Sequence, residues 1–186
     1  MIIAPHTILE FWFEEAGHKK WYKKSDAFDA EIRARYEELA LELAALLRRN
    51  NIHKWEENPD STLALIIVLD QFTRNMYRDT KAAFAFDDLA LAVAKRAVDR
   101  GDDLKISQDR RPFIYMPYMH SEVLADQDEC VRLMDMRLNS ASSLHHAKEH
   151  RKLIVKYKRF PHRNAILDRQ STDEERKFLE SGGYSP

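Results

Sequence analysis

The scarcity of turn-forming residues is the feature that most constrains this chain. Its 186 residues include only four glycines and six prolines. Antiparallel β-sandwiches and glycine-rich nucleotide folds need more residues that favour turns. Apolar residues instead recur at intervals of three and four along most of the sequence, which is the period of a helix with one buried face. We therefore expect an all-α protein.

Capping residues predict where the helices begin and end. Ser25 is a good N-cap for a long helix that ends at Asn50 and Asn51, and Asn58-Pro59 opens the next one. That next helix, residues 61–77, begins apolar on every side and should be buried all round. Antiparallel helical hairpins packed in one domain, residues 1–186, are the simplest arrangement. Further helices are expected at residues 82–100, as two short pieces across 107–122, at 126–138, from Ser142 or Ser143 to Arg159, and after Ser171.

Composition argues against several classes of function. The formal net charge is −1 at pH 7, so no overall field would recruit nucleic acid or an anionic membrane. The single cysteine, Cys130, leaves no intrachain disulfide and no multi-cysteine zinc site. The longest strongly apolar run, residues 63–69, is too short to cross a bilayer. Since the first residues also lack a basic leader, we expect a cytoplasmic protein.

The first polar string, residues 69–75 (LDQFTRN), follows the most apolar run without a break. It places Asp70 with Arg74, and Gln71 with Asn75, four residues apart on one helix face. Buried charges need partners because an unpaired charge is costly away from water. One interpretation is an ion pair and an amide pair that fix helix packing; the other is a pocket where Arg74 and Asn75 face a ligand. In either case we expect Asp70 and Arg74 to pair and to be at least half buried.

The second string, residues 115–122 (YMPYMHSE), contains Pro117, which removes a backbone donor from its helix. His120, Ser121 and Glu122 therefore follow irregular backbone, where polar side chains can converge on a site. His120 and Glu122 are two residues apart and do not share a helix face, so they are poor joint metal ligands. The alternative is a structural histidine that is hydrogen-bonded to a neighbouring carboxylate or carbonyl.

The third string, residues 159–164 (RFPHRN), concentrates polar groups where Pro161 ends a helix. Arg163 can bind an anion through two donors, Asn164 through its amide, and His162 as a titrating donor. Arg159 precedes the turn and adds a further cation. The alternative is a capping arrangement that ties down the C-terminal helix.

Residues 145–163 carry two further patterns. His146, Glu149 and His150 match the H-x-x-E-H pattern of inverted zinc metallopeptidases. His150 also lies on a semi-apolar helix face, which indicates packing, and we expect neither a metal nor another cofactor. The stretch is rich in lysine and arginine, but few aromatic residues are available to stack on bases. Nucleic acid is therefore not favoured as a partner.

The three strings, together with FWF at residues 11–13, resemble the bacterial domain of unknown function 924 family over nearly the whole chain. The resemblance implies a compact all-α fold of the tetratricopeptide-like superhelical class with no settled activity. No 34-residue repeat is visible, so that topology rests on the resemblance alone. The chain departs from the family pattern at Thr73, where proline is frequent, and at Lys158 and Asp168, where glycine is usual.

The resemblance and the polar strings give one set of candidate ligand-binding residues: Asp70, Gln71, Arg74, Asn75, His120, Ser121, Glu122, Arg159, His162, Arg163 and Asn164. We expect the strings to meet around one polar pocket, because scattered buried polar clusters would each bear a desolvation cost. Such a pocket would bind a small anionic molecule or the acidic end of a peptide. An enzyme using histidine and glutamate as acid and base there, and a pure protein-interaction module, are the alternatives. The sequence gives no indication of oligomeric state.

Overall fold

The computed structural model describes residues 3–21 and 23–184, and within these ranges the chain is helical and contains no strand. The expected all-α class is confirmed. None of the helices in these ranges is long and apolar enough to cross a bilayer. The elements begin with α1 (Pro5–Leu9), the π-helix η1 (Glu10–Ala16), α2 (His18–Trp21) and α3 (Asp26–Asn50).

The middle of the chain is a row of short elements that cross the core. The first four of these elements are the 3-10 helix η2 (Lys54–Glu57), α4 (Pro59–Ile66), the π-helix η3 (Ile67–Phe72) and α5 (Thr73–Met76). They are followed by η4 (Lys81–Phe84), α6 (Asp87–Asp99) and η5 (Asp103–Lys105). The last part holds α7 (Pro112–His120), α8 (Leu124–Arg137), α9 (Ala141–Tyr157), η6 (Pro161–Arg163) and α10 (Asp173–Glu180).

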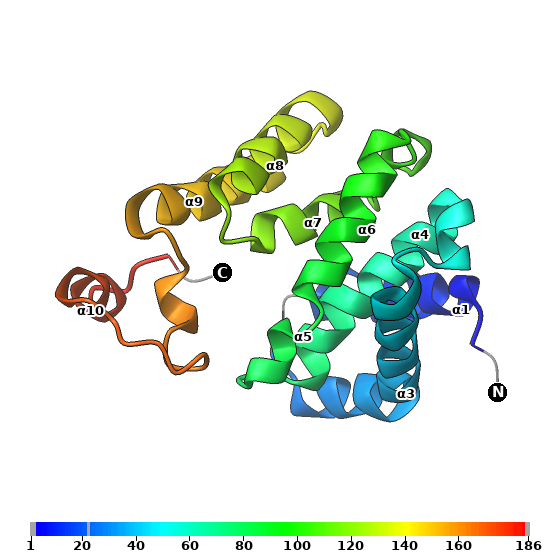
Figure 1. The fold of residues 1–186 in the computed structure, drawn as a ribbon, viewed down its shortest axis with the longest axis horizontal. Coiled ribbons are helices and arrows are strands. Elements are labelled where there is room, and N and C mark those ends of the chain that lie inside the picture. The colour runs from blue at the N-terminus through cyan, green and yellow to red at the C-terminus, as the bar shows by residue number, and fades with distance from the viewer. Residues whose placement is uncertain (1–2, 22, 185–186) are drawn as a thin grey trace.

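The helices follow one another across the molecule in chain order (Figure 1). α1 and α3 lie at one end, α6 and α7 cross the middle, and α10 lies at the other end. α8 and α9 form an antiparallel hairpin, and α7 packs against α8 and α6. The end of α5 and the start of α6 therefore face the segment that follows α9, which is where the polar strings meet. The tetratricopeptide-like topology and the single-domain organisation stay expectations.

Local capping signals predicted several boundaries correctly. The Ser25 side chain accepts a hydrogen bond from the Phe28 N–H at 3.3 Å, and Asn51 ends α3 in the left-handed region with φ 63°. The Asn58 side chain accepts from the N–H groups of Asp60 and Ser61. These caps succeed as predictions because their partners lie within three residues of the cap.

Boundaries that depend on packing were predicted less well. The helix expected at residues 82–100 begins at Asp87, because Lys81–Phe84 form a separate 3-10 turn. Pro117 does not divide the 107–122 segment: α7 is one helix, and burial on both sides holds it together. The capping box of α10 uses Thr172 and Glu175, one residue beyond the expected start at Ser171, and Ser140 caps α9 in place of Ser142 or Ser143.

An aromatic cluster fixes η3 against the N-terminal helices. Phe72 is fully buried, with its ring stacked on Tyr36 at 4.9 Å and edge-on to Phe11 at 5.7 Å and Trp12 at 5.6 Å, centroid to centroid. Phe72 thus joins η3 to both α3 and η1. Because this face of η3 is committed to the core, the polar residues on either side of Phe72 are held in one orientation.

Truncating this ring should be costly. We expect Phe72→Ala to lower the free energy of unfolding by about 3–5 kcal/mol, because it leaves a cavity among three aromatic neighbours. Chemical denaturation followed by circular dichroism measures the change. Leu41→Ala, at a side chain on α3 that is 52% exposed, is the control and should cost less than about 0.5 kcal/mol. Similar losses in the two variants would contradict the assignment of Phe72 to the core.

Candidate functional site

Asp70 is the buried centre of the polar cluster. Its side chain is 1% exposed, and its Oδ1 lies 2.7 Å from His120 Nδ1 and 3.3 Å from Arg74 Nη2. Gln71 Nε2 donates to Oδ2 at 2.5 Å. Burial alone would raise the pKa of Asp70, but the neighbouring His120 and Arg74 and their hydrogen bonds lower it well below its usual range. The expected Asp70–Arg74 pair is confirmed, and both side chains are more than half buried.

The π-helix η3 sets the direction of these side chains. Its wider turn changes the angular spacing that residues have in an α-helix. Gln71 contacts Asp70 and the Met116 sulfur, whereas Asn75 donates to Asp29 Oδ1 at 2.7 Å. The possible amide pair between Gln71 and Asn75 is therefore not formed. Single π-turns inside helices are frequent at functional sites.

Two guanidinium groups meet beside Asp70. Arg74 Nη2 donates to both oxygens of Asp87 at 3.0 and 3.1 Å, and its guanidinium lies 5.5 Å from the centre of the Phe84 ring. Arg163 lies over the same ring at 4.8 Å and donates from Nη1 to the His120 carbonyl at 3.0 Å. The three strings therefore converge, as expected. Arg74 and Arg163 each contact His120, and Asp87 lies between the two arginines.

Burial, and then the charge of Arg74, lowers the pKa of Arg163 to about 10. Burial also raises the pKa of Asp87, the carboxylate that lies between the two arginines. Sequence reasoning did not identify Asp87 or Phe84 as part of the site. An aspartate near a helix N-terminus is common, so its position alone carries no signal.

Two further imidazoles border this cluster. Burial lowers the pKa of His150 to about 3 and that of His162 to about 4. His150 Nδ1 lies 2.8 Å from the His146 carbonyl oxygen, and its ring centre lies 6.5 Å from that of His120. The His150 Nδ1–H therefore caps a carbonyl of its own helix, which matches the packing interpretation of the H-x-x-E-H pattern. In residues 3–21 and 23–184, no group of three histidine, cysteine or acidic side chains is placed to hold a metal.

The remaining candidate residues bind other parts of the chain. Glu122 accepts from Arg169 at 2.6 and 3.0 Å and from the Phe160 N–H at 2.8 Å. These contacts connect the end of α7 to the turn that follows α9. The other candidate residues form side-chain hydrogen bonds: Ser121 with Asp126, Arg159 with Glu175, Asn164 with Ser171, and Asn75 with Asp29. Arg159 and Asn164 thus act as the capping interpretation predicted, since they hold the segment that leads into α10.

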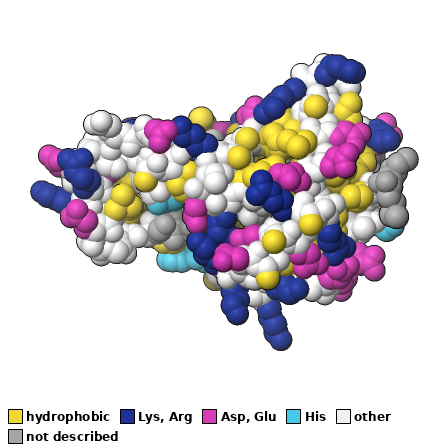
Figure 2. Space-filling model, turned by 90° about the horizontal axis from the view of Figure 1, so that it is seen from below, with side chains coloured by type: hydrophobic (Ala, Val, Ile, Leu, Met, Phe, Trp, Pro, Cys, Tyr) yellow, Lys and Arg dark blue, Asp and Glu magenta, His cyan; other side chains and the backbone are white. Residues whose placement is uncertain are grey.

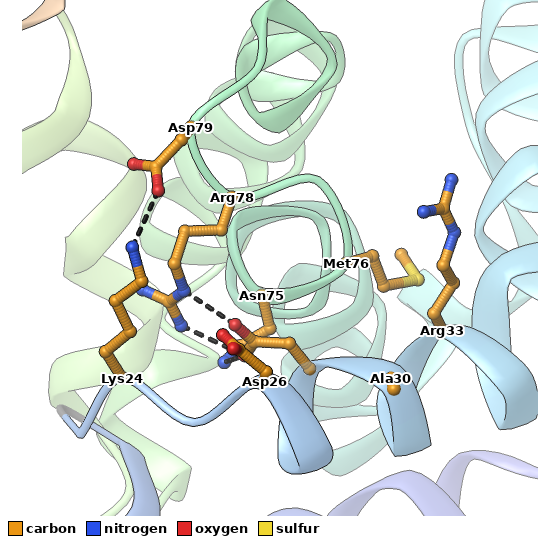
Figure 3. A pocket seen from close by; sticks show the side chains of 9 residues that line it. Lys24, Asp26, Ala30, Arg33, Asn75, Met76, Arg78 and Asp79 are labelled. Carbon is orange, nitrogen blue, oxygen red and sulfur yellow. Dashed lines mark hydrogen bonds and ion pairs between the residues drawn. The ribbon is translucent and has the colours of Figure 1, made fainter.

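Two pockets open away from this cluster. One, of about 310 Å³, lies between α3 and the end of α5 and is lined by Asn75, Arg78 and Lys24 among others. Figure 3 shows Arg78 reaching toward α3, with Lys24 paired to Asp79 beside it. The other, of about 430 Å³, is lined by Lys19, Lys20 and Lys23. Neither reaches His120 or Arg163, so the single polar pocket around the three strings stays a prediction.

The surface carries both signs of charge. On the face seen in Figure 2, acidic and basic side chains are interspersed, and histidines border a group of lysine and arginine side chains. The basic run of residues 145–163 is largely paired, because Arg151, Lys152, Lys156 and Arg159 each contact a carboxylate. A paired run offers fewer cations to a phosphate backbone.

Comparisons with known proteins agree with the helical fold. A family model described as "Bacterial protein of unknown function (DUF924)" matches residues 8–183. The chain is also similar to the solved structure of ATU0120 from Agrobacterium tumefaciens, itself a protein of unknown function. The two share 39% sequence identity, with 96% of this chain and 97% of the other covered and a TM-score of 0.87. A search of curated proteins found no match.

Removing Arg74 should strand two carboxylates in the interior. We expect Arg74→Ala to lower the free energy of unfolding by about 3 kcal/mol or more, because Asp70 and Asp87 lose their shared partner. Denaturant unfolding measures the loss. Arg33→Ala breaks an exposed pair with Glu37, also four residues apart, and should cost less than about 1 kcal/mol. If Arg74→Ala cost as little as Arg33→Ala, Asp70 could not depend on this arginine.

Acid should destabilise the protein through His150 and His162. Their folded-state pKa values, about 3 and 4, lie below the ordinary value of 6.5. Between those values the unfolded chain binds protons that the folded chain excludes, so stability is complete above pH 6.5 and falls as the pH drops. Each histidine should contribute about 2 kcal/mol to the loss between pH 7.5 and pH 5.

Urea unfolding at the two pH values measures this loss. His162→Gln should remove its share of the pH dependence, while His6→Gln, at an exposed position, should leave it unchanged. The same pH dependence in His162→Gln as in the unsubstituted protein would show that His162 is not held neutral by burial.

Proposed function

The chain belongs to the bacterial family of unknown function DUF924, and for this member we propose a site that binds the acid group of a small molecule, or of an acidic peptide end. The site is the cluster of Arg163, Arg74 and His120. It is built at the junction of α5, α6, α7 and the turn after α9.

Buried polar atoms without a hydrogen-bond partner carry this proposal. In the described part of the chain there are nine, and four fall within residues 162–169: His162 Nδ1, Arg163 Nε, Asn164 Oδ1 and Arg169 Nε. Such an atom costs roughly 1–3 kcal/mol, so a concentration in one short segment indicates a partner outside the chain. Two of the four are arginine N–H groups, which can only donate. Their missing partner is therefore an acceptor.

The charges around Arg163 favour an anionic acceptor. Arg74, Arg159 and Arg169 each have a carboxylate bound through two hydrogen bonds. Arg163 bonds only to a backbone carbonyl, and its closest carboxylate oxygen, on Asp87, lies 3.8 Å away. A carboxylate or phosphate could accept from Arg163 through two oxygens, which is the geometry that a guanidinium favours.

Residues outside this site support the compartment and the partners that we propose. A single buried thiol, Cys130, whose pKa burial raises to about 12, needs no oxidising environment, and this supports a cytoplasmic location. The paired basic run on α9 supports a small acidic ligand over nucleic acid.

The proposal predicts stabilisation by simple acids. Adipate, succinate, inorganic phosphate and an acetylated dipeptide ending in aspartate are the probes, and thermal unfolding is the measurement. A bound probe at 100 times its Kd should add about 2.7 kcal/mol, which raises Tm by roughly 5–10 °C for a chain of this length. The absence of a shift with all four probes would refute the proposal.

Variants test whether Arg163 is the anion-binding residue. Arg163→Met keeps an apolar stem against Phe84 and Phe160 but removes the guanidinium, and it should abolish the shift. Arg176→Met is the control, because Arg176 lies on the nearby α10, is exposed and pairs with Asp173. It should retain the full shift. A shift retained in Arg163→Met would place the acid group elsewhere.

A further inference from the structure

The Asp70–His120 pair has the geometry of an oriented imidazole base. His120 Nδ1 lies 2.7 Å from Asp70 Oδ1, and an ionised carboxylate can only accept. Nδ1 therefore carries the proton and donates it to Asp70. Arg74 Nε also directs its N–H toward this nitrogen from 3.2 Å, a hydrogen bond that only an unprotonated Nδ1 could accept, and the shorter contact with the ionised Asp70 favours the protonated Nδ1. In the neutral ring the lone pair then lies on Nε2.

Nε2 of His120 is accessible. Within the described chain, Nε2 has no hydrogen-bond partner. It is nevertheless not one of the buried polar atoms without a partner, and the His120 side chain is 16% exposed. The neighbouring imidazoles lack a carboxylate at Nδ1: that of His150 lies 2.8 Å from the His146 carbonyl oxygen, and that of His162 is buried without a partner. Burial and the charge of Arg74 lower the pKa of His120, so the ring is neutral near pH 7.

Side chains that could attack a substrate are engaged elsewhere. Ser121 donates its hydroxyl hydrogen to Asp126 at 2.7 Å, and Thr73 donates to the backbone carbonyls of Leu69 and Asp70 at 2.8 and 3.0 Å. Burial raises the pKa of the Cys130 thiol to about 12, which keeps it protonated. A base in these surroundings would act on water rather than on a protein nucleophile.

We propose that His120, with Asp70 as its positioning residue, is the general base of a hydrolytic site for small carboxylic esters that carry a second, free acid group. The inference rests on the proposed function, because Arg163 holds the free acid group. His120 Nε2 takes a proton from a water molecule while the water oxygen bonds to the ester carbonyl carbon. The bond from that carbon to the alcohol oxygen then breaks, and the proton passes from Nε2 to the departing oxygen. Ester and water give one acid and one alcohol, and His120 ends neutral.

Two chromogenic esters test the proposal. The 4-nitrophenyl monoester of adipic acid carries a free carboxylate, and 4-nitrophenyl hexanoate is its uncharged counterpart of the same chain length. Release of 4-nitrophenolate at pH 7.5, corrected for spontaneous hydrolysis, gives kcat and KM. We expect kcat/KM to be at least 10-fold higher for the adipate ester. His120→Gln should lower this value at least 100-fold, as removal of a general base does, while His6→Gln should not change it.

Variants separate binding from catalysis. Arg163→Met should raise KM for the adipate ester and bring the two esters to equal kcat/KM. Asp70→Asn should lower kcat and also move the midpoint of the pH profile to lower pH, since the carboxylate raises the pKa of His120. The other groups facing that ring are Arg74, Asp87, His150 and Arg163. These remain unchanged in Asp70→Asn, so the shift reports on Asp70 itself.

The outcomes of these experiments distinguish the hydrolytic inference from the proposed anion site. Equal rates for the two esters, no hydrolysis of either, or full activity in His120→Gln would overturn the hydrolytic inference. If adipate still raises Tm in that case, the anion site stands and only the catalytic step falls. If Asp70→Asn unfolds, as circular dichroism would show, His120→Gln alone still decides the role of the base. A lower kcat in Asp70→Asn with an unmoved pH midpoint would leave Asp70 with a structural role only.

Discussion

An ionised carboxylate in the interior is the constraint on which the rest of this structure depends. Asp70 is almost fully buried and remains charged only because donors reach it from its own turn, from α5 and from α7. Bringing Arg74 to Asp70 also buries a guanidinium, which in turn needs Asp87 from the start of α6. One buried charge thus determines where three helices must end or begin.

The network of charged side chains around Asp70 continues into the C-terminal segment. Asp87 lies between Arg74 and Arg163, and both guanidiniums share the ring of Phe84. Glu122 at the end of α7 then binds Arg169 and the Phe160 N–H. Asp87 at the start of α6 and Glu122 just after α7 lie at helix ends, where side chains and free backbone groups are available together.

Interactions between residues close in sequence could be predicted, and those that depend on distant partners could not. The spacing of Asp70 and Arg74 predicted their pairing, and the caps at Ser25 and Asn58 were read directly from the sequence. The need of buried polar groups for partners also predicted that the strings meet. The identity of the partners Asp87 and Arg169 depends on how α6 and the last turn pack, which no local pattern records. The π-turn in η3 escaped prediction because helical periodicity assumes a constant 3.6 residues per turn.

The C-terminal segment has its own small apolar cluster, in which Phe160 packs with Leu153 and Ile154, apart from the main core. Polar contacts connect the residues after Phe160 to the elements between η4 and the end of α7: Arg163 to the His120 carbonyl, Arg169 to Glu122, and Lys81 to Asp168. Ionic strength acts on such contacts and leaves apolar packing nearly untouched. Salt therefore weakens one attachment selectively, and residues 161–184 should exchange their backbone amide hydrogens faster in concentrated salt while the helices around Phe72 stay protected.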